Sequence, residues 1–352
     1  MKSFSFLSLS FFLYSCNGFS FLATHIPSNF RLHCRPFATV KPYEGETRSI
    51  VGVVGRGYVP TLTAKLLALT GYQTWMIVPA GEQERIDSLI LDDVHLDQIQ
   101  SNLEFLSSTD QEAVMDKLIS TDALIFAVDG DGVIDPAVVD FLLNPTLCKT
   151  IKRVVAMSRN LNGKGMGFFV KASKFSANPE VWAAESELIA QYKSFEEQIK
   201  LRSKLCGAEY TIVRSGTLKG GACGDIASST LEEVEDDNNK EPAYYPQYLT
   251  SMFYEYTKRD IITWQLLFDC RARGTFLSKG DTLAGPGLKA VFTATAGEAC
   301  PGDTSRCGVA EAMMRSLFIE EARNIDFAVG SKEGRVPPSD AEWESMFRSL
   351  IR

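Results

Sequence analysis

Short apolar runs alternate with stretches of helical period along most of the chain. Runs such as Ser49–Val54, Gln73–Val78 and Ala123–Val128 are rich in aliphatic side chains and are bounded by polar or glycine-containing segments. This alternation is typical of βαβ units, in which parallel strands are buried on both faces. Further strands are predicted at 102–106, 151–157, 210–214 and 325–329. The pattern therefore predicts an α/β fold built on a doubly wound parallel sheet.

Helices are predicted between these strands. Their expected ranges are 61–69 (ended by Gly71), 111–119 (capped by Ser108, Thr109 or Asp110), 136–143, 182–205 and 308–318. The alternation of strand and helix patterns stops between 223 and 302. There an acidic stretch at 231–241 indicates an exposed loop, and several tyrosines follow it. We expect one domain at 44–222, a small C-terminal cap region at 223–302, and a segment at 303–352 that completes the domain.

The first 43 residues have the composition of two targeting segments. Lys2 precedes an apolar run at 4–14, which is shorter than the ~20 residues that span a bilayer, so residues 1–18 are typical of a signal peptide. Residues 19–43 are basic, hydroxyl-bearing and free of acid, as in a transit peptide, and begin at Phe19. Together they resemble the bipartite leader of algae with complex plastids, which implies the plastid stroma; secretion is the alternative. No later segment is predicted to span a membrane.

The charge of the chain argues against one class of partner. The first 43 residues carry four basic and no acidic side chains, so the rest has a net charge of −12 where the whole chain has −8. Duplex binding needs clustered Lys and Arg to contact phosphates. Sequence-specific nucleic-acid binding is therefore not expected, whereas protein partners stay possible.

The eight cysteines form no C-x-x-C pair and have no histidine at ligand spacing. The interpretation we favour is free, mostly buried thiols. Cys300 and Cys307 flank a stretch with glycine and proline, so a disulfide or redox pair there is the alternative. No metal site is predicted.

A glycine-rich turn follows the first predicted strand. Gly55-Arg56-Gly57-Tyr58-Val59-Pro60 has the spacing of G-x-G-x-x-G, with proline in the third position. The first glycine permits a tight turn, and the second lets the backbone approach a pyrophosphate at the N-terminus of the next helix. Placement between a strand and a helix predicts a Rossmann-type dinucleotide site, with a tight turn that holds no ligand as the alternative.

The end of the second strand bears on the choice of cofactor. An acid there would bind the ribose 2′-hydroxyl of NAD(H), but the sequence reads Val78-Pro79-Ala80, with the first acid at Glu82. Arg85, a few residues further on, is the residue expected to reach a 2′-phosphate. NADP(H) is therefore predicted over NAD(H), which stays possible.

Several later segments resemble the atypical short-chain dehydrogenase/reductase family, in particular its NmrA-like NAD(P)-binding members of plastids. Residues 152–158 (KRVVAMS) resemble the family's fifth strand, and 209–216 (EYTIVRSG) resemble its D-Y-T-I-V-R-P-G strand and turn. Residues 306–312 (RCGVAEA) are similar to its R-x-D-V-A-E helix start. The similar pieces spread over 49–350 and are weakest between 223 and 300. The resemblance implies cofactor contacts from Gly55, Arg56, Gly57, Tyr58, Ala127, Val128, Ser158, Ser215 and Gly216.

The usual catalytic pair of that superfamily is altered. Its tyrosine donates a proton and a lysine four residues later lowers the tyrosine pKa and holds the ribose. Here Tyr192 is followed at once by Lys193, and the fourth residue after it is Glu196. Adjacent helical residues point about 100° apart, so Tyr192, Lys193 and Ser158 are catalytic candidates in a non-standard arrangement. Two hypotheses stay open: an NADP(H)-dependent oxidoreductase of a small plastid metabolite, and a non-catalytic dinucleotide-binding scaffold or photosynthetic-complex assembly factor.

Overall fold

The computed structural model describes residues 49–79, 100–129, 132–160, 172, 187–219, 274–281, 303–332 and 338–351. The predictions made above for the leader, Arg85, Cys300 and most of the cap region concern residues outside these ranges.

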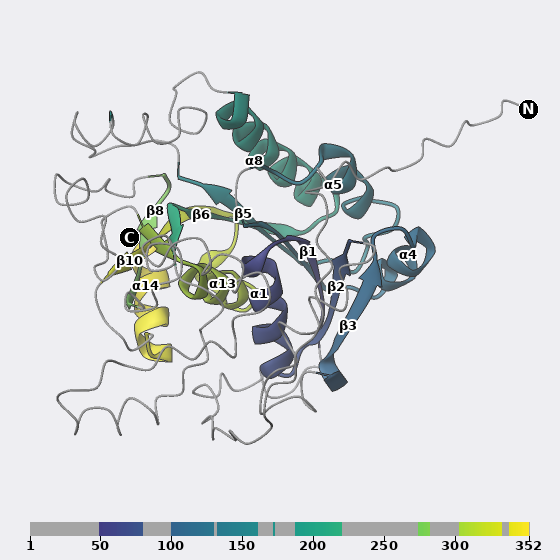
Figure 1. Cartoon of the computed structure of the whole chain (residues 1–352), viewed down its shortest axis with the longest axis horizontal. Coiled ribbons are helices and arrows are strands. Elements are labelled where there is room, and N and C mark those ends of the chain that lie inside the picture. The colour runs from purple at the N-terminus through teal and green to yellow at the C-terminus, as the bar shows by residue number, and fades with distance from the viewer. Residues whose placement is uncertain are drawn as a thin grey trace, which may run out of the picture. The chain divides into compact units, whose positions relative to one another are not determined.

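An eight-stranded sheet forms the centre of the fold (Figure 1). Its order is β3-β2-β1-β4-β5-β6-β10-β8, and every neighbouring pair is parallel except β10 and β8. The bounds are β1 Ile50–Arg56, β2 Gln73–Val78, β3 Leu103–Ser107, β4 Ala123–Val128, β5 Arg153–Arg159, β6 Glu209–Ser215, β8 Gly274–Lys279 and β10 Ile325–Lys332. The direction of the order reverses between β1 and β4, as in a Rossmann-type sheet. The predicted α/β fold class is confirmed.

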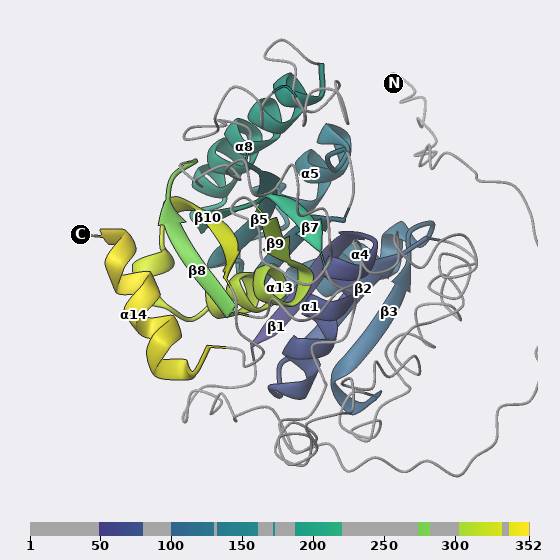
Figure 2. The same ribbon diagram turned by 60° about the vertical axis from the view of Figure 1, so that its left-hand side comes forward.

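Helices cover both faces of this sheet (Figures 1 and 2). One face carries α1 (Tyr58–Leu69), α13 (Arg306–Arg315) and α14 (Asp340–Ile351), whose apolar side chains share one core cluster. The other face carries α4 (Gln111–Ile119), α5 (Pro136–Leu142) and α8 (Glu187–Leu205), which share a second cluster. Strands such as β4, buried along almost their whole length, explain the continuous apolar runs in the sequence.

Local signals place several helix ends where the sequence predicts them. Asp110 caps α4 by accepting a hydrogen bond from the amide of Ala113 at 3.0 Å, and Asp135 does the same for Ala137 at 2.8 Å, directly before Pro136. These side chains bind amides that the helix itself leaves without a partner. Gly71 follows α1 with a φ of 90°, the left-handed conformation expected of a C-terminal glycine.

Two boundaries differ from the predicted ones in ways that affect the site. α1 begins at Tyr58 rather than at residue 61, because Pro60 is tolerated inside a first helical turn. β5 extends to Arg159, so Ser158 lies within the strand rather than after it. Strands were also missed: β8 comes from the predicted cap region yet pairs with β10 in the main sheet. β7 (Thr217–Lys219) and β9 (Asp303–Ser305) form a small parallel sheet.

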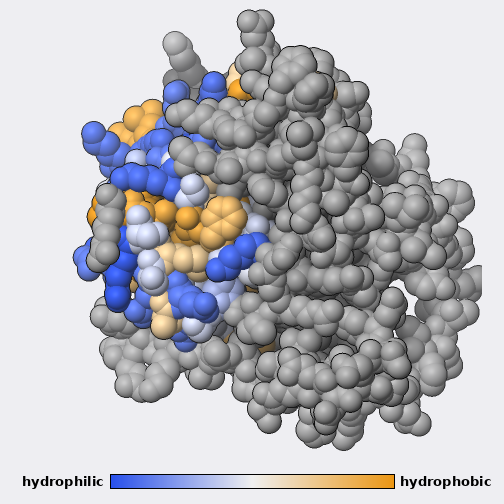
Figure 3. Space-filling model, turned by 90° about the vertical axis from the view of Figure 1, so that its left-hand side faces the viewer, coloured by the Kyte–Doolittle hydropathy of each residue, from blue (hydrophilic) through white to orange (hydrophobic). Residues whose placement is uncertain are grey.

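The face on which β8 and α14 lie shows hydrophobic side chains gathered among hydrophilic ones (Figure 3). β8 is the last strand of the sheet at this edge.

Among the described segments, none is a helix with the length and hydropathy needed to cross a bilayer. Cys148 is a buried free thiol and Cys206 a half-buried one, so the favoured interpretation of the cysteines holds for these two.

Candidate functional site

The glycine turn lies against the end of β4 and the residue that follows it. A Cβ atom on Gly55 would lie 1.6 Å from the carbonyl oxygen of Ala127, and one on Gly57 would lie 2.6 Å from Cβ of Asp129. Gly57 also has a φ of 92°, which residues with a side chain rarely adopt. Both glycines are therefore required by the packing of β1 against β4, in addition to any role toward a ligand.

The turn leads directly into the N-terminus of α1. Gly57 is the residue before the helix, and no side chain in the described part of the chain caps the helix there. The hydroxyl of Thr61 donates to the Gly57 carbonyl at 2.9 Å and holds the first turn against the glycine. Amides at a helix N-terminus attract anions because they lack intrahelical partners and lie at the positive end of the dipole. The residues present therefore fit the diphosphate of a dinucleotide.

Arg56 reaches from the end of β1 toward the loop after β4. Its side chain is exposed, and a Cβ atom on Gly132 would lie 3.1 Å from its Nη2 atom. The backbone at Arg56 also accepts a hydrogen bond from the Asp129 amide at 3.0 Å. A guanidinium is thus placed at the mouth of the turn, where it can contact a bound phosphate.

An ion pair that the sequence predictions missed lies beside Gly57. Nε of Arg306, the first residue of α13, lies 2.7 Å from Oδ2 of Asp129, which follows β4. The Asp129 side chain is 5% exposed and that of Arg306 11%. Asp129 stands at the carboxyl end of a central strand, where ligands of such sheets bind. Its place directly after the predicted fourth strand is the feature of the sequence that could have marked it as a site residue.

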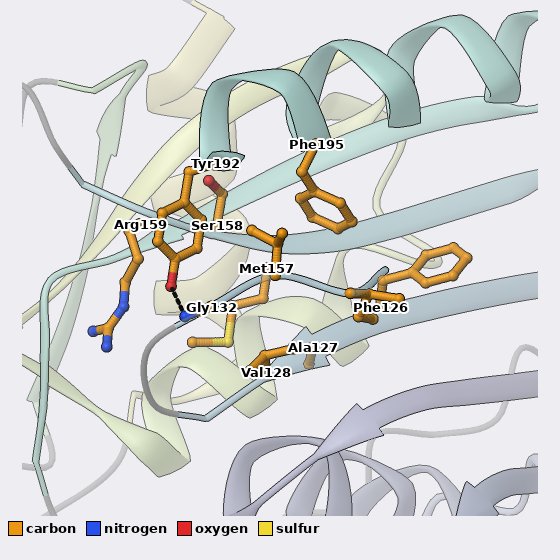
Figure 4. A pocket seen from close by; sticks show the side chains of 11 residues that line it. Phe126, Ala127, Val128, Gly132, Met157, Ser158, Arg159, Tyr192 and Phe195 are labelled. Atoms are coloured by element: carbon orange, nitrogen blue, oxygen red, sulfur yellow. Dashed lines mark hydrogen bonds between the residues drawn. The ribbon is translucent and has the colours of Figure 1, made fainter. Parts of the chain in front are cut away.

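Ser158 and Tyr192 lie in one small cavity at the same edge of the sheet (Figure 4). The phenol oxygen of Tyr192 accepts a hydrogen bond from the amide of Gly132 at 3.2 Å. Ser158 is 1% exposed, and its hydroxyl has no hydrogen-bond partner among the described residues. The cavity volume is about 10 Å³, which is room for about one water molecule.

Besides Ser158, the lining of this cavity includes two residues that the family resemblance singled out. Ala127 and Val128, at the end of β4, form part of its wall. Arg159 stands at its rim, where Figure 4 shows the guanidinium beside the Tyr192 ring. The remaining walls are mostly apolar, from Phe126, Val133, Ile134, Met157 and Phe195. The site therefore combines an apolar floor with a few convergent polar groups, as binding pockets do.

Lys193 does not join Tyr192 in this cavity. Its side chain is exposed and is absent from the lining, as expected from the helical angle between adjacent residues. Glu196, four residues after Tyr192, binds Arg214 of β6 through both carboxylate oxygens. The structure thus brings Ser158 and Tyr192 together and leaves Lys193 apart from them.

Ser215 and Gly216 are tied into the protein at the end of β6. The Ser215 hydroxyl donates to the carbonyl of Ser158 at 3.3 Å. The amide of Gly216 donates to the Thr304 hydroxyl at 2.7 Å, and its carbonyl accepts from Arg159 at 2.8 Å. Both residues are buried, so their visible role is to join β6 to β5 and β9.

No protein-family model matches the sequence, and no curated protein matches it significantly. Among solved structures, the chain is similar to a short-chain dehydrogenase/reductase from Veillonella parvula, at 13% identity and a TM-score of 0.46 over 84% of this chain and 100% of that one. The NADP complex of a V. parvula short-chain dehydrogenase/reductase matches at 15% identity and 0.45, over 83% and 99%. A yeast methylglyoxal/isovaleraldehyde reductase with NADPH matches at 12% and 0.42, over 80% and 75%. Each similarity is distant and assigns no residue role or substrate to this chain.

Proposed function

We propose that the protein binds NADP(H) at the turn formed by Gly55, Arg56 and Gly57 and acts as an NADP(H)-dependent oxidoreductase on a small metabolite. The observation that carries the proposal is the position of the turn. It lies between β1 and β4, where the strand order reverses, and it leads into the N-terminus of α1. Ligands of open α/β sheets bind at this reversal, beyond the carboxyl ends of the strands.

The chain's own residues would then divide the work of carbonyl reduction. The nicotinamide ring supplies the hydride when the cofactor is bound. Tyr192 carries the hydroxyl that can donate a proton to the carbonyl oxygen, and Ser158 carries a buried hydroxyl that can hold that oxygen in place. Arg56 adds a guanidinium at the mouth of the turn. NADP(H) is preferred because Val78 and Pro79, at the end of β2, offer no acid to the ribose.

A second candidate is a non-catalytic dinucleotide-binding scaffold or assembly factor. Specific observations favour it: Lys193 is exposed away from the cavity, Glu196 is engaged by Arg214, and the cavity between Ser158 and Tyr192 has room for about one water. Reduction of a substrate would need this cavity to open, whereas a scaffold needs only the turn at Gly57.

Titration calorimetry separates the parts of the proposal. We expect the purified protein to bind NADPH more tightly than NADH, and Arg56→Gln to weaken NADPH binding because it removes a cation from the turn. Lys193→Gln, which changes an exposed cation outside the cavity, is the matched control and should leave the affinity unchanged. Equal or absent binding of the two dinucleotides would reject the cofactor assignment.

Absorbance of NADPH at its nicotinamide band then tests for catalysis. A panel of small aldehydes and ketones should include a compound whose reduction consumes NADPH, and Tyr192→Phe should slow that reduction by about 10²–10⁴-fold. Tight NADPH binding with no oxidation across the panel, and none beyond the rate in buffer, would favour the scaffold.

The leader supports a proposal for location. The acid-free basic segment at 19–43, placed after an apolar run, supports import into the stroma of a complex plastid. A fluorescent fusion of residues 1–43 should accumulate in the plastid, and the same fusion with Phe19→Ala should be held before the stroma. Secretion of the unaltered fusion would reject this location.

A further inference from the structure

The buried ion pair between Asp129 and Arg306 lies against the proposed diphosphate site. Asp129 approaches Gly57 so closely that a Cβ atom there would be 2.6 Å from Cβ of Asp129 and 3.2 Å from its carbonyl oxygen. Its amide is bonded to the carbonyl of Arg56. Asp129 is therefore bonded to the turn through its amide and packs against Gly57, so its side chain lies beside the turn proposed to bind the diphosphate.

A carboxylate at this position opposes the binding of a diphosphate. Like charges repel strongly in a partly buried site, because the low dielectric weakens screening. Arg306 offsets the charge of Asp129 at a distance of 2.7 Å. The guanidinium belongs to α13, which lies beside α1 in both views of the ribbon (Figures 1 and 2). A cation from the C-terminal part of the chain thus lies near the glycine turn, which belongs to the N-terminal part of the fold.

Guanidinium groups are well suited to phosphate as well as to carboxylate. Arginine offers five N–H donors in a planar fork, and it binds the oxygens of either group in pairs. A carboxylate and a phosphate near one guanidinium are therefore alternative partners for it.

We propose that Arg306 binds the diphosphate of the dinucleotide and that Asp129 competes with the ligand for it. The inference rests on the proposed function, because it concerns the same turn. The pair sets the affinity of the site: Asp129 weakens anion binding by holding Arg306 and by its own charge, and Arg306 strengthens it. Asp129 is an internal stand-in for a phosphate oxygen in this arrangement.

The alternative is a pair that only stabilises the fold. Breaking a buried pair from either side leaves an unpaired charge and destabilises the protein, so this alternative predicts that both single substitutions lower the affinity. Competition predicts effects of opposite sign. The direction of the change therefore separates the two roles.

The test uses the full chain and three variants, each of which removes one charge. Asp129→Asn removes the competing charge, and Arg306→Gln removes the guanidinium. Arg315→Gln is the matched control, since Arg315 also lies on α13 in a buried pair, with Glu311, near the opposite end of the helix. Calorimetry measures binding of NADPH and of inorganic pyrophosphate, and urea unfolding records the stability of each variant.

We expect Asp129→Asn to bind both ligands about tenfold more tightly and Arg306→Gln about tenfold more weakly, as for one gained or lost charge-assisted contact. Arg315→Gln should lower stability and leave both affinities unchanged. Affinities that fall together in Asp129→Asn and Arg306→Gln, or that do not change, would overturn the competition.

The two ligands keep this inference separate from the proposed function. Opposite shifts for pyrophosphate without any NADPH binding would support the competition and reject the dinucleotide. NADPH binding that both variants weaken would support the dinucleotide and reject the competition. If the unaltered chain binds neither ligand, pyrophosphate binding by Asp129→Asn supports the competition, and its absence overturns it.

Discussion

Glu196 and Arg214 form a two-point ion pair across the surface of the sheet. Nε of Arg214 lies 2.8 Å from Oε1 of Glu196, and its Nη2 lies 2.7 Å from Oε2. Asp326 of β10 binds the same guanidinium. Burial alone would lower the pKa of Arg214, but its bonds to the two carboxylates raise it above its ordinary value. Glu196, at the position of the lysine in a Tyr-x-x-x-Lys motif, is thus a carboxylate that joins α8 to β6.

Restoring the lysine should therefore damage the fold instead of creating the catalytic pair. Glu196→Lys places a second cation beside Arg214, and we expect a loss of about 3–5 kcal/mol in the free energy of unfolding, the usual cost of breaking a buried pair. Urea denaturation measures it. Glu197→Lys, at the exposed neighbouring position, is the control and should change stability by less than about 0.5 kcal/mol. Equal effects at the two positions would mean that the pair contributes nothing.

The hydroxyl of Ser158 should be dispensable for stability. It is buried and has no hydrogen-bond partner in the part of the chain that the structure describes, and such a group is costly to keep in the folded state. Ser158→Ala should therefore leave the free energy of unfolding unchanged or raise it. Ser215→Ala, which removes a hydroxyl bonded to the Ser158 carbonyl, should lower it by about 1 kcal/mol. If Ser158→Ala lowers the free energy of unfolding as much as Ser215→Ala does in urea unfolding, the Ser158 hydroxyl forms a hydrogen bond in the folded protein. If the protein reduces a substrate and Ser158→Ala leaves the rate unchanged, the hydroxyl does not hold the substrate.

Two glycines with similar backbone angles separate strain from contact. Gly57 and Gly71 have φ values of 92° and 90°. A Cβ atom on Gly71 would meet nothing within 4 Å, whereas one on Gly57 would collide with Asp129. We expect Gly57→Ala to cost about 1–3 kcal/mol more than Gly71→Ala, the usual cost of overpacking. Thermal and urea unfolding of both variants measure this difference. If the two variants lose the same free energy of unfolding, a side chain at position 57 does not collide with Asp129. A larger residue at Gly57 would therefore weaken ligand binding through the fold as well as directly.

The thiol of Cys148 should make stability sensitive to alkaline pH. Burial raises its pKa to about 11, with a further contribution from Cys206 nearby, against the effect of the Asn144 backbone. The unfolded thiol has a pKa of about 8.5, so above that pH the unfolded state loses its proton first. The stabilising effect of the protonated thiol is complete below pH ~8.5 and is lost as the pH rises toward 11.

Cys148→Ala tests this by comparison of two pH series. The variant should be less stable at neutral pH because of the volume it loses, yet its stability should fall less between these two pKa values than that of the unaltered protein. Urea unfolding at each pH gives the difference. Parallel curves would show that Cys148 does not titrate differently in the two states.

Local patterns in the sequence were enough to predict most of the fold. Val53 and Ile125 belong to apolar runs that can only be satisfied by burial on both faces of a sheet. Asp110, Asp135 and Gly71 mark helix ends by bonds and backbone angles that involve residues two to four positions away. Such signals depend on neighbours in the chain, so they can be read before the chain is folded. β7, β8 and β9 were missed because short or edge strands depend on partners far along the chain.

The candidate site divides along the same line. The sequence by itself determined that a strand, Gly55, Gly57 and a helix follow one another, because the turn is local. Only the tertiary structure decided what surrounds it. Asp129 and Arg306 are 177 positions apart, and Glu196 and Arg214 lie on different elements. Ion pairs of this kind depend on distances of a few ångströms between side chains, and those distances exist only once the sheet and both helical layers have packed.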